Sequence, residues 1–133
     1  MRRLVVDASA LVEVLLATDL AAGIESEIAR SDVELHTPAL CDVEVASALR
    51  RALLAGRLEE TRARHALRDL ADLPLTRHGH QLLLGWTLEL RHNFSAYDAT
   101  YLALAERLGA TLVTADRPLA SALRSQLGLS VIG

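Results

Sequence analysis

Four acidic residues stand where a carboxylate could take part in chemistry. Asp7 ends a short apolar run rich in branched residues, and Asp116 follows a second such run, residues 111–114. Glu44 lies inside an otherwise apolar helical stretch, and Asp98 falls in the first turn of another predicted helix. Ligands of open α/β sheets bind at the carboxyl ends of the strands. The pattern therefore predicts that the four carboxylates meet at one edge of a sheet.

Four carboxylates in one pocket repel one another and raise each other's pKa unless a cation neutralises them. Oxygen ligands without Cys or His select Mg²⁺ or Mn²⁺ over zinc. Such ions lower the pKa of bound water, place it in line with a phosphodiester and stabilise the leaving oxygen. The chemistry that these residues predict is metal-dependent hydrolysis of a phosphodiester.

Most of these acids also have a simpler structural explanation when taken alone. Asp7 or Ser9 could cap the first helix, Asp116 could cap the helix that follows it, and residues 95–98 match a capping box. Glu44 has no such role, because it lies in the middle of a helical stretch, and acids are rarely buried without a partner. It is the combination of four that favours a site.

Apolar periodicity and turn residues divide the chain into alternating strands and helices. The sequence predicts strands at residues 3–6, 33–37, 75–77, 111–114 and 129–132, and helices at residues 9–17, 19–30, 39–55, 58–73, 81–91, 95–109 and from 117 onward. A strand, helices and a second strand open the chain, so we expect a parallel sheet. The helices at 39–55 and 58–73 are expected to form a helical hairpin.

The composition is that of one globular domain spanning residues 1–133, with a core of Leu, Val and Ala because only 3% of residues are aromatic. The single cysteine, Cys41, rules out an intramolecular disulfide, fits a reducing compartment and is expected to be small apolar filler. The first residues lack a signal pattern, and no apolar run reaches the roughly 18 residues of a membrane span. We expect a cytoplasmic protein without a membrane segment.

The charge balance leaves a nucleic-acid partner open. The formal net charge is −3, which the four proposed site acids could account for on their own. All 14 basic residues are Arg, which favours bidentate contact with phosphate, although a general preference for Arg over Lys explains this equally well. Four arginines are close to the proposed acids in sequence, but a solvated surface position is the simpler interpretation of each: Arg50, Arg51, Arg91 and Arg117.

Over essentially its whole length the sequence resembles the PIN-domain ribonucleases, most closely the VapC-type toxins of bacterial toxin–antitoxin pairs. The resemblance is carried by three segments, LVVDASALVEVLL, TPALCDVEVASALRRAL and SAYDATYLALAERLGATLVTAD. Each motif is short and degenerate, but their order, their spacing and the chain length together are specific. The resemblance implies a three-layer α/β/α sandwich around a parallel sheet of about five strands.

The resemblance also implies a site and a function. The site is a Mg²⁺ or Mn²⁺ centre built from Asp7, Glu44, Asp98 and Asp116, with Ser9 and Thr114 at small-hydroxyl positions where they would hold a carboxylate or water. The function is that of an endoribonuclease toxin that cuts structured RNA, such as tRNA or rRNA, and so inhibits translation. The implied partners are a second copy of the chain and a VapB-type antitoxin whose tail enters the acidic groove.

Other residues give weaker signals. His78 and His80 could bind metal, but with no Cys or acid near them an exposed turn is the better interpretation. Four scattered aromatic residues could stack on bases, although packing in the core or in a dimer interface is favoured: Trp86, Phe94, Tyr97 and Tyr101.

Four other functions are possible for an α/β chain of this size. Receiver domains and dehalogenase-like phosphatases hold a phosphoryl group with Lys, which this sequence lacks. An RNase H-like nuclease would open with a meander of strands, whereas here the first strand leads directly into a helix. A non-catalytic module of this type that binds RNA or a protein without cutting remains the alternative, and the presence of all four acids argues against it.

Overall fold

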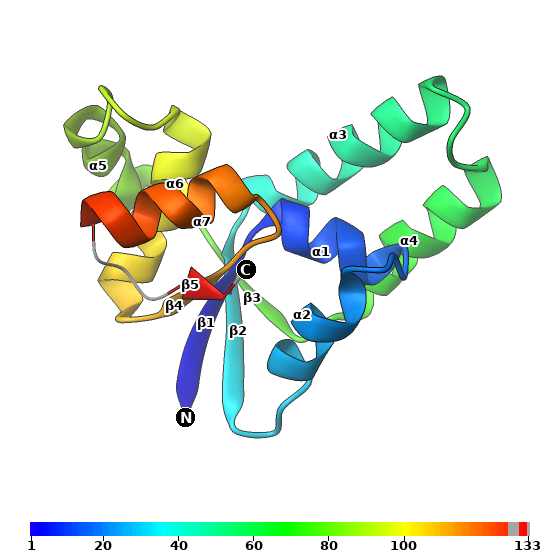
Figure 1. Cartoon of the computed structure of the whole chain (residues 1–133), viewed down its shortest axis with the longest axis horizontal. Helices are drawn as coiled ribbons and strands as arrows, with labels where there is room; N and C mark the ends of the chain where they lie inside the picture. Colours follow the sequence, from blue (N-terminus) through cyan, green and yellow to red (C-terminus); the bar gives the residue numbers. More distant parts are fainter. Residues whose placement is uncertain (128–130, 133) are drawn as a thin grey trace.

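The computed structural model describes residues 1–127 and 131–132. At its centre lies a sheet of parallel strands in the order β3-β2-β1-β4-β5 (Figure 1). The strands are β1 (Arg2–Val6), β2 (Val33–Pro38), β3 (Leu75–His78), β4 (Thr111–Val113) and the two-residue edge strand β5 (Val131–Ile132). The predicted parallel sheet is confirmed. Of the predicted last strand, residues 129 and 130 lie outside the described residues.

Helices cover both faces of this sheet (Figure 1). One side holds α1 (Ala8–Leu15), α2 (Ala21–Ile28), α3 (Leu40–Leu54) and α4 (Glu60–Asp72), and the other holds α5 (Leu84–Glu89), α6 (Ala96–Leu108) and α7 (Arg117–Ala122). This is the three-layer α/β/α arrangement that the resemblance implied. Among the residues described, no helix is both long and apolar enough to cross a membrane.

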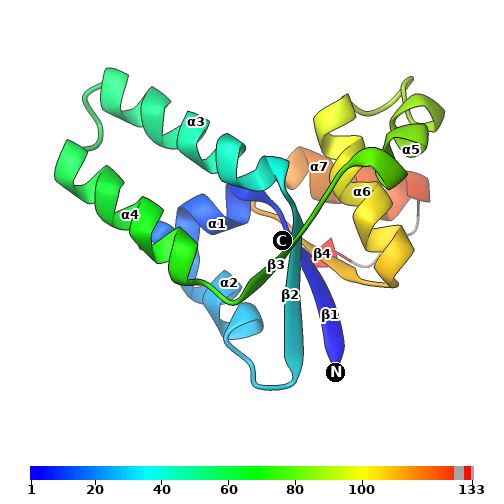
Figure 2. The ribbon, with the colours of Figure 1, turned by 180° about the vertical axis from the view of Figure 1, so that it is seen from behind.

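The helices α3 and α4 form the predicted hairpin, which extends away from the sheet (Figure 2). Gly56 makes the reversal with a φ of 71°, a left-handed conformation that glycine adopts without strain. At the other end of α4, Leu73 is already extended, because the following Pro74 disfavours helical backbone before it. The Arg62 guanidinium donates to the carbonyl of Leu15 at 2.7 Å and so ties α4 to the end of α1.

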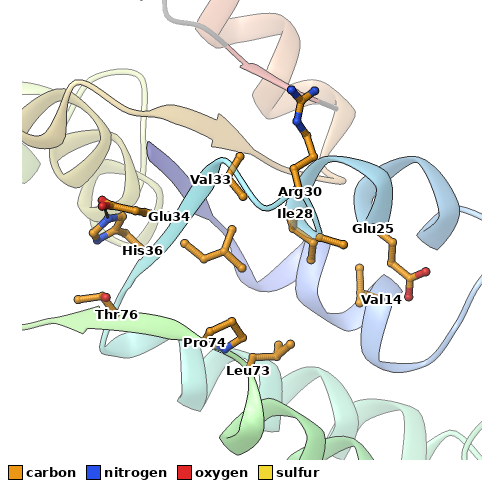
Figure 3. Close-up of a pocket in the computed structure, with 12 residues that line it drawn as sticks. Val14, Glu25, Ile28, Arg30, Val33, Glu34, His36, Leu73, Pro74 and Thr76 are labelled. Atoms are coloured by element: carbon orange, nitrogen blue, oxygen red, sulfur yellow. Dashed lines mark hydrogen bonds and ion pairs between the residues drawn. The ribbon is translucent and has the colours of Figure 1, made fainter. Parts of the chain in front are cut away.

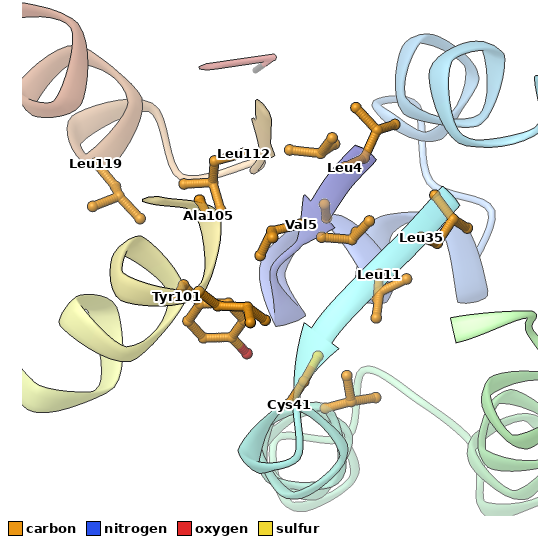
Figure 4. Close-up of a cluster of buried hydrophobic side chains, with 14 of the residues drawn as sticks. Leu4, Val5, Leu11, Leu35, Cys41, Tyr101, Ala105, Leu112 and Leu119 are labelled. Carbon is orange, nitrogen blue, oxygen red and sulfur yellow. The ribbon is translucent and has the colours of Figure 1, made fainter. Parts of the chain in front are cut away.

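The core is built around β1, the central strand (Figure 4). Leu4, Val5 and Val6 are completely buried, and full burial of a side chain of this size stabilises the fold by about 1.5–3 kcal/mol. α6 packs against this layer with an unbroken buried run that includes Tyr101 and Ala105. Cys41 is buried in the same cluster, as the prediction of apolar filler requires.

The prediction of one helix over residues 81–91 is wrong in its extent. A short 3₁₀ turn, η1 (Gln81–Leu83), precedes a six-residue α5, and Leu83 is buried whereas Leu82 is 73% exposed. Gly85, near the start of α5, is a poor helix former. The apolar residues around it do not form a single buried face of the helix. A five-residue π-helical segment, η2 (Leu123–Leu127), follows α7.

Candidate functional site

The four predicted acids line one cleft at the carboxyl edge of the sheet. Its volume is about 380 Å³. Asp7 follows β1, Asp116 follows β4, Glu44 comes from α3 and Asp98 from the first turn of α6. These positions meet because β1 and β4 are paired neighbours in the sheet, with Val6 opposite Val113.

Asp7 is held most firmly of the four. It is 5% exposed and caps α1, since its Oδ1 accepts a 3.0 Å hydrogen bond from the backbone N–H of Ala10. The hydroxyl of Ser9 donates to the same oxygen at 2.7 Å, and the hydroxyl of Thr114 donates to Oδ2. Ser9 therefore does not cap the helix, which was one of the two predicted possibilities. The cap is Asp7, and Ser9 holds its carboxylate.

Ser9 and Thr114 also connect Asp7 to the segment that carries Asp116. Each hydroxyl has one proton, and both protons go to the carboxylate of Asp7. Their oxygens are thus free to accept, and they do so from the backbone N–H groups of Ala115 and Asp116, each at 3.0 Å. The two hydroxyls fix the acid after β1 relative to the backbone after β4.

Asp116 is the exposed member of the group and caps α7. Its Oδ1 accepts from the N–H of Leu119 at 3.0 Å, and Pro118 within the first turn suits a helix start. Within the described part of the chain, no hydrogen bond reaches its Oδ2. The capping role and a role in the cleft are therefore compatible, since the cap uses one oxygen and leaves the other.

Glu44 has a specific partner in Tyr101. The Tyr101 hydroxyl donates to Oε1 of Glu44 at 2.6 Å, which explains how a half-buried acid is tolerated in the middle of α3. Its Oε2 carries no hydrogen bond from the described residues. Sequence reasoning placed Tyr101 in a core or an interface. It is indeed buried, but its hydroxyl belongs to the cleft, and no sequence signal pairs it with an acid 57 positions away.

Asp98 is the acid whose carboxylate has the fewest hydrogen bonds among the described residues. Ser95 caps α6 by accepting from the backbone N–H of Asp98 at 3.1 Å, which is one half of the predicted capping box. The half-buried carboxylate itself receives no hydrogen bond within the described residues. It therefore keeps both oxygens for other ligands.

Burial is the main cause of the unusual electrostatics of the cleft. It raises the pKa of Asp7, although the bonds from Thr114, Ala10 and Ser9 act in the opposite direction and the charge of Asp116 adds to the rise. The pKa of Glu44 is raised by burial and by Asp98, and that of Asp98 by burial and by Asp116. The acids thus destabilise one another's charge, as expected for carboxylates that share a site.

The donor set suits a hard divalent cation. No group of three or more His, Cys, Asp or Glu side chains in the described part of the chain could hold a metal ion by itself. Mg²⁺, however, is usually bound by one or two carboxylates and completes its octahedron with water and phosphate oxygens. Open oxygens on Glu44, Asp98 and Asp116 in one cleft fit that mode of binding better than a closed protein cage.

Two further charged residues line the cleft. Glu13 lies one helical turn after Ser9, so their spacing places both on one face of α1, and its carboxylate accepts from the hydroxyl of Thr18. The sequence did not point to Glu13. Arg51, one of the four arginines that the sequence places near the acids, comes from α3. It is the only basic residue among those that line the cleft in the described structure.

The two histidines do not form an exposed turn, so that expectation was wrong. His78 is half-buried at the end of β3, with its Nε2 at 2.9 Å from Nδ1 of His36, and burial together with His36 lowers its pKa. Nε2 of His80 accepts from the backbone N–H of Leu40 at 2.9 Å and so satisfies the start of α3. Neither residue lines the acidic cleft.

A larger hollow of about 800 Å³ lies beside β2, between α2 and the segment after α4 (Figure 3). Its lining is mostly apolar, with Ile28, Val33 and Leu73 among its residues, and Glu34 and His36 stand at one side. None of the four acids lines it. Size alone does not mark the site, since the smaller cleft is the one that all four predicted acids line.

Comparison with known proteins gives concordant matches. The PIN domain family model matches residues 4–122. Ribonuclease VapC9 of Mycobacterium tuberculosis is 41% identical over 129 residues, which cover 97% of this chain and 98% of the relative. Ribonuclease VapC3 of the same organism is 40% identical over 121 residues, which cover 90% of this chain and 87% of the relative.

Solved structures share the fold. PAE2754 from Pyrobaculum aerophilum has a TM-score of 0.70 at 25% identity, covering 98% of this chain and 83% of that chain. M. tuberculosis VapC20, described as a Sarcin-Ricin loop cleaving toxin, has a TM-score of 0.68 at 20% identity, covering 90% and 94%. VapBC2 from Rickettsia felis, solved with a DNA fragment from its promoter, has a TM-score of 0.65 at 12% identity, covering 97% and 96%.

Proposed function

Because the chain belongs to the VapC ribonucleases of the PIN-domain family, we propose that it is a Mg²⁺- or Mn²⁺-dependent endoribonuclease whose active site is the acidic cleft. One observation carries this proposal. Carboxylates that come from α3, α6 and the segments directly after β1 and β4 line a single cleft, although they are distant in sequence. A purely structural use of these acids would not require them to share a site.

Asp7, Glu44, Asp98 and Asp116 would hold the cation, directly or through water. The chemistry that a divalent ion supplies at such a site is a lowered pKa of water and neutralisation of charge on a phosphodiester. The protein's own contribution is positional. Asp7 is fixed by three donors, and Ser9 and Thr114 hold that carboxylate in place against the segment that carries Asp116.

Glu44 and Asp98 are suited to accept a proton. Hydrolysis of a phosphodiester requires that the attacking water give up a proton, and a carboxylate takes it more readily when its pKa is raised toward neutrality. Each has an oxygen without a hydrogen-bond donor in the described structure, and burial raises the pKa of whichever of the two carboxylates the cation does not neutralise. The leaving oxygen then takes a proton from solvent.

The substrate class that we propose is structured RNA, such as tRNA or rRNA, whose cleavage would inhibit translation in the cytoplasm. Family membership supports ribonuclease action, and VapC20, which shares the fold, is described as cleaving the Sarcin-Ricin loop. Incubation of the purified protein with total RNA, with and without Mg²⁺ or Mn²⁺, tests this directly. The expected result is cation-dependent cleavage that Asp98→Asn reduces to background, and equal cleavage by that variant would overturn the site.

We also propose that the chain is the toxin of a pair and that a VapB-type antitoxin binds it. A solved protein of the same fold is a VapBC assembly, which supports a partner of this kind. Expression of the chain alone should arrest growth, and Asp7→Asn should relieve the arrest. Normal growth with intact RNA during expression of the unmodified chain would contradict the toxin function.

A homodimer is the remaining proposal about assembly. Several large apolar side chains around α5 are exposed, including Leu82, Trp86 and Leu88, and a second copy of the chain would cover them. Light scattering on the purified protein measures the oligomeric state. A monomer at micromolar concentration would contradict this proposal.

A further inference from the structure

We propose that Arg51 is the phosphate-binding residue of the cleft. Its guanidinium would hold a backbone phosphate of the RNA strand while the neighbouring phosphodiester lies at the four acids. This inference rests on the proposed ribonuclease function and adds to it a residue that positions the substrate.

The helix α3 presents two different faces. Cys41, Val45 and Leu49 recur every four residues and face the core. The cleft is lined instead by Glu44, Ala48 and Arg51, which follow one another at intervals of four and three residues and so share a second face. Over these seven residues the helix rises by about 10 Å. Arg51 therefore lies roughly two turns from Glu44 along the same wall of the cleft.

The guanidinium of Arg51 is largely unused by the protein. Its Nη1 donates to the hydroxyl of Ser47, one turn back on α3, at 3.0 Å. Within the described residues it has no ion pair, although it lines a cleft with five acids. Arg77, by contrast, is paired with Asp42 at 2.8 Å, and Arg62 is committed to a backbone carbonyl. Arginine has five N–H donors, so most of those on Arg51 remain available to a ligand.

The negative charge of the cleft explains why a positively charged side chain is needed beside it. An RNA strand brings further negative charge to a group of carboxylates, and without a positive side chain its phosphates would be repelled. The planar guanidinium binds phosphate through two parallel hydrogen bonds, which fixes orientation as well as charge. An exposed arginine at the outer part of the acidic wall is positioned to do this for a phosphate adjacent to the one that is cut.

The test measures RNA binding separately from cleavage. In an Asp98→Asn background, the affinity for a labelled single-stranded RNA oligonucleotide of mixed sequence is measured in Mg²⁺ over a range of salt. Arg51→Ala should weaken binding about tenfold, as expected for loss of hydrogen bonds to a charged group. It should also lower the slope of log affinity against log salt by about one. Arg51→Lys keeps the positive charge but lacks the paired N–H donors of the guanidinium, and it should recover part of the affinity.

Arg50→Ala is the matched control. Arg50 is the adjacent residue on the same helix, is also exposed, and does not line the cleft. Both variants lose one positive charge, so a general electrostatic effect would weaken binding equally in both, and that result would overturn the proposal. Thermal unfolding of each variant should match that of the parent protein, because neither side chain contributes to the core.

The outcomes distinguish the role of Arg51 from the ribonuclease function on which it rests. If the unmodified protein cleaves RNA but Arg51→Ala binds as tightly as its parent, the role of Arg51 is refuted and the nuclease function stands. If the unmodified protein neither binds nor cleaves RNA, both are refuted. Cleavage kinetics give an independent measure, since loss of a phosphate contact that is equal in ground and transition states raises KM and leaves kcat nearly unchanged.

Discussion

The hydroxyl of Tyr101 donates a 2.6 Å hydrogen bond to Oε1 of Glu44, and this bond joins α6 to α3 beside the acidic cleft. Burial raises the pKa of Tyr101, so the phenol keeps its proton and remains a donor throughout the physiological range. The carboxylate cannot donate in return while it is ionised. Glu44 therefore has a fixed orientation although it is only half-buried.

Tyr101→Phe should remove this constraint with little change in packing. We expect the free energy of unfolding to fall by about 1 kcal/mol, the net value of a hydrogen bond. Ribonuclease activity should fall about tenfold, as for other residues that orient a metal-binding carboxylate. The pKa of Glu44 should rise further, since the bond lowers it. Cleavage rates across pH and denaturant unfolding measure these effects, and Tyr97→Phe, at an exposed tyrosine, should change neither.

Thr114→Val tests the link between Asp7 and Asp116. The valine is similar in size but removes the donor to Asp7 and the acceptor for the backbone N–H of Asp116. Two buried or partly buried groups lose a partner, so a loss of stability of about 1–3 kcal/mol and a clear loss of cleavage are expected. Thr100→Val is the control, because in the described part of the chain that buried hydroxyl bonds only to the carbonyl of Ala96 in the same helix, α6. Equal effects on cleavage in the two variants would show that the link does not position the acids.

The topology of the fold could be predicted because it depends on local patterns. The apolar run before Asp7 and the helical periodicity after it predict a strand followed by a helix, and the same logic places Asp116 after β4. Parallel pairing of the two strands then brings their ends together. That the four acids line one cleft follows from this topology, whereas their role in catalysis remains a prediction.

What could not be predicted depends on contacts between distant residues. The bond from Tyr101 to Glu44 and the cap that His80 provides for α3 join positions 57 and 40 residues apart. Neither has a spacing rule, because each arises from the way that α3 lies against other elements. The helix expected at 81–91 is too long because several apolar residues of this stretch are exposed and do not form one buried helical face.

Removal of a cleft acid should stabilise the protein at neutral pH in metal-free buffer. The pKa of Asp98 is raised above 3.8 by burial and by Asp116, so between 3.8 and the raised value the folded protein binds more protons than the unfolded chain. The free energy of unfolding therefore falls as pH rises through this window. Asp98→Asn removes that penalty and should raise Tm at pH 7.5. The gain should shrink as pH approaches 3.8, and a gain independent of pH would contradict this explanation.

Divalent cations should stabilise the fold through the same acids. A ligand that binds only the folded protein adds about 2.7 kcal/mol to the free energy of unfolding when its concentration is a hundred times its Kd. Thermal unfolding with increasing Mn²⁺ or Mg²⁺ measures this without any substrate. Asp116→Asn should weaken the response, and because Asn is also a good helix cap, the variant should keep α7 intact. Asp19→Asn, at an exposed acid outside the cleft, should respond as the unmodified protein does. Identical responses in all three proteins would mean that the cation binds outside the cleft.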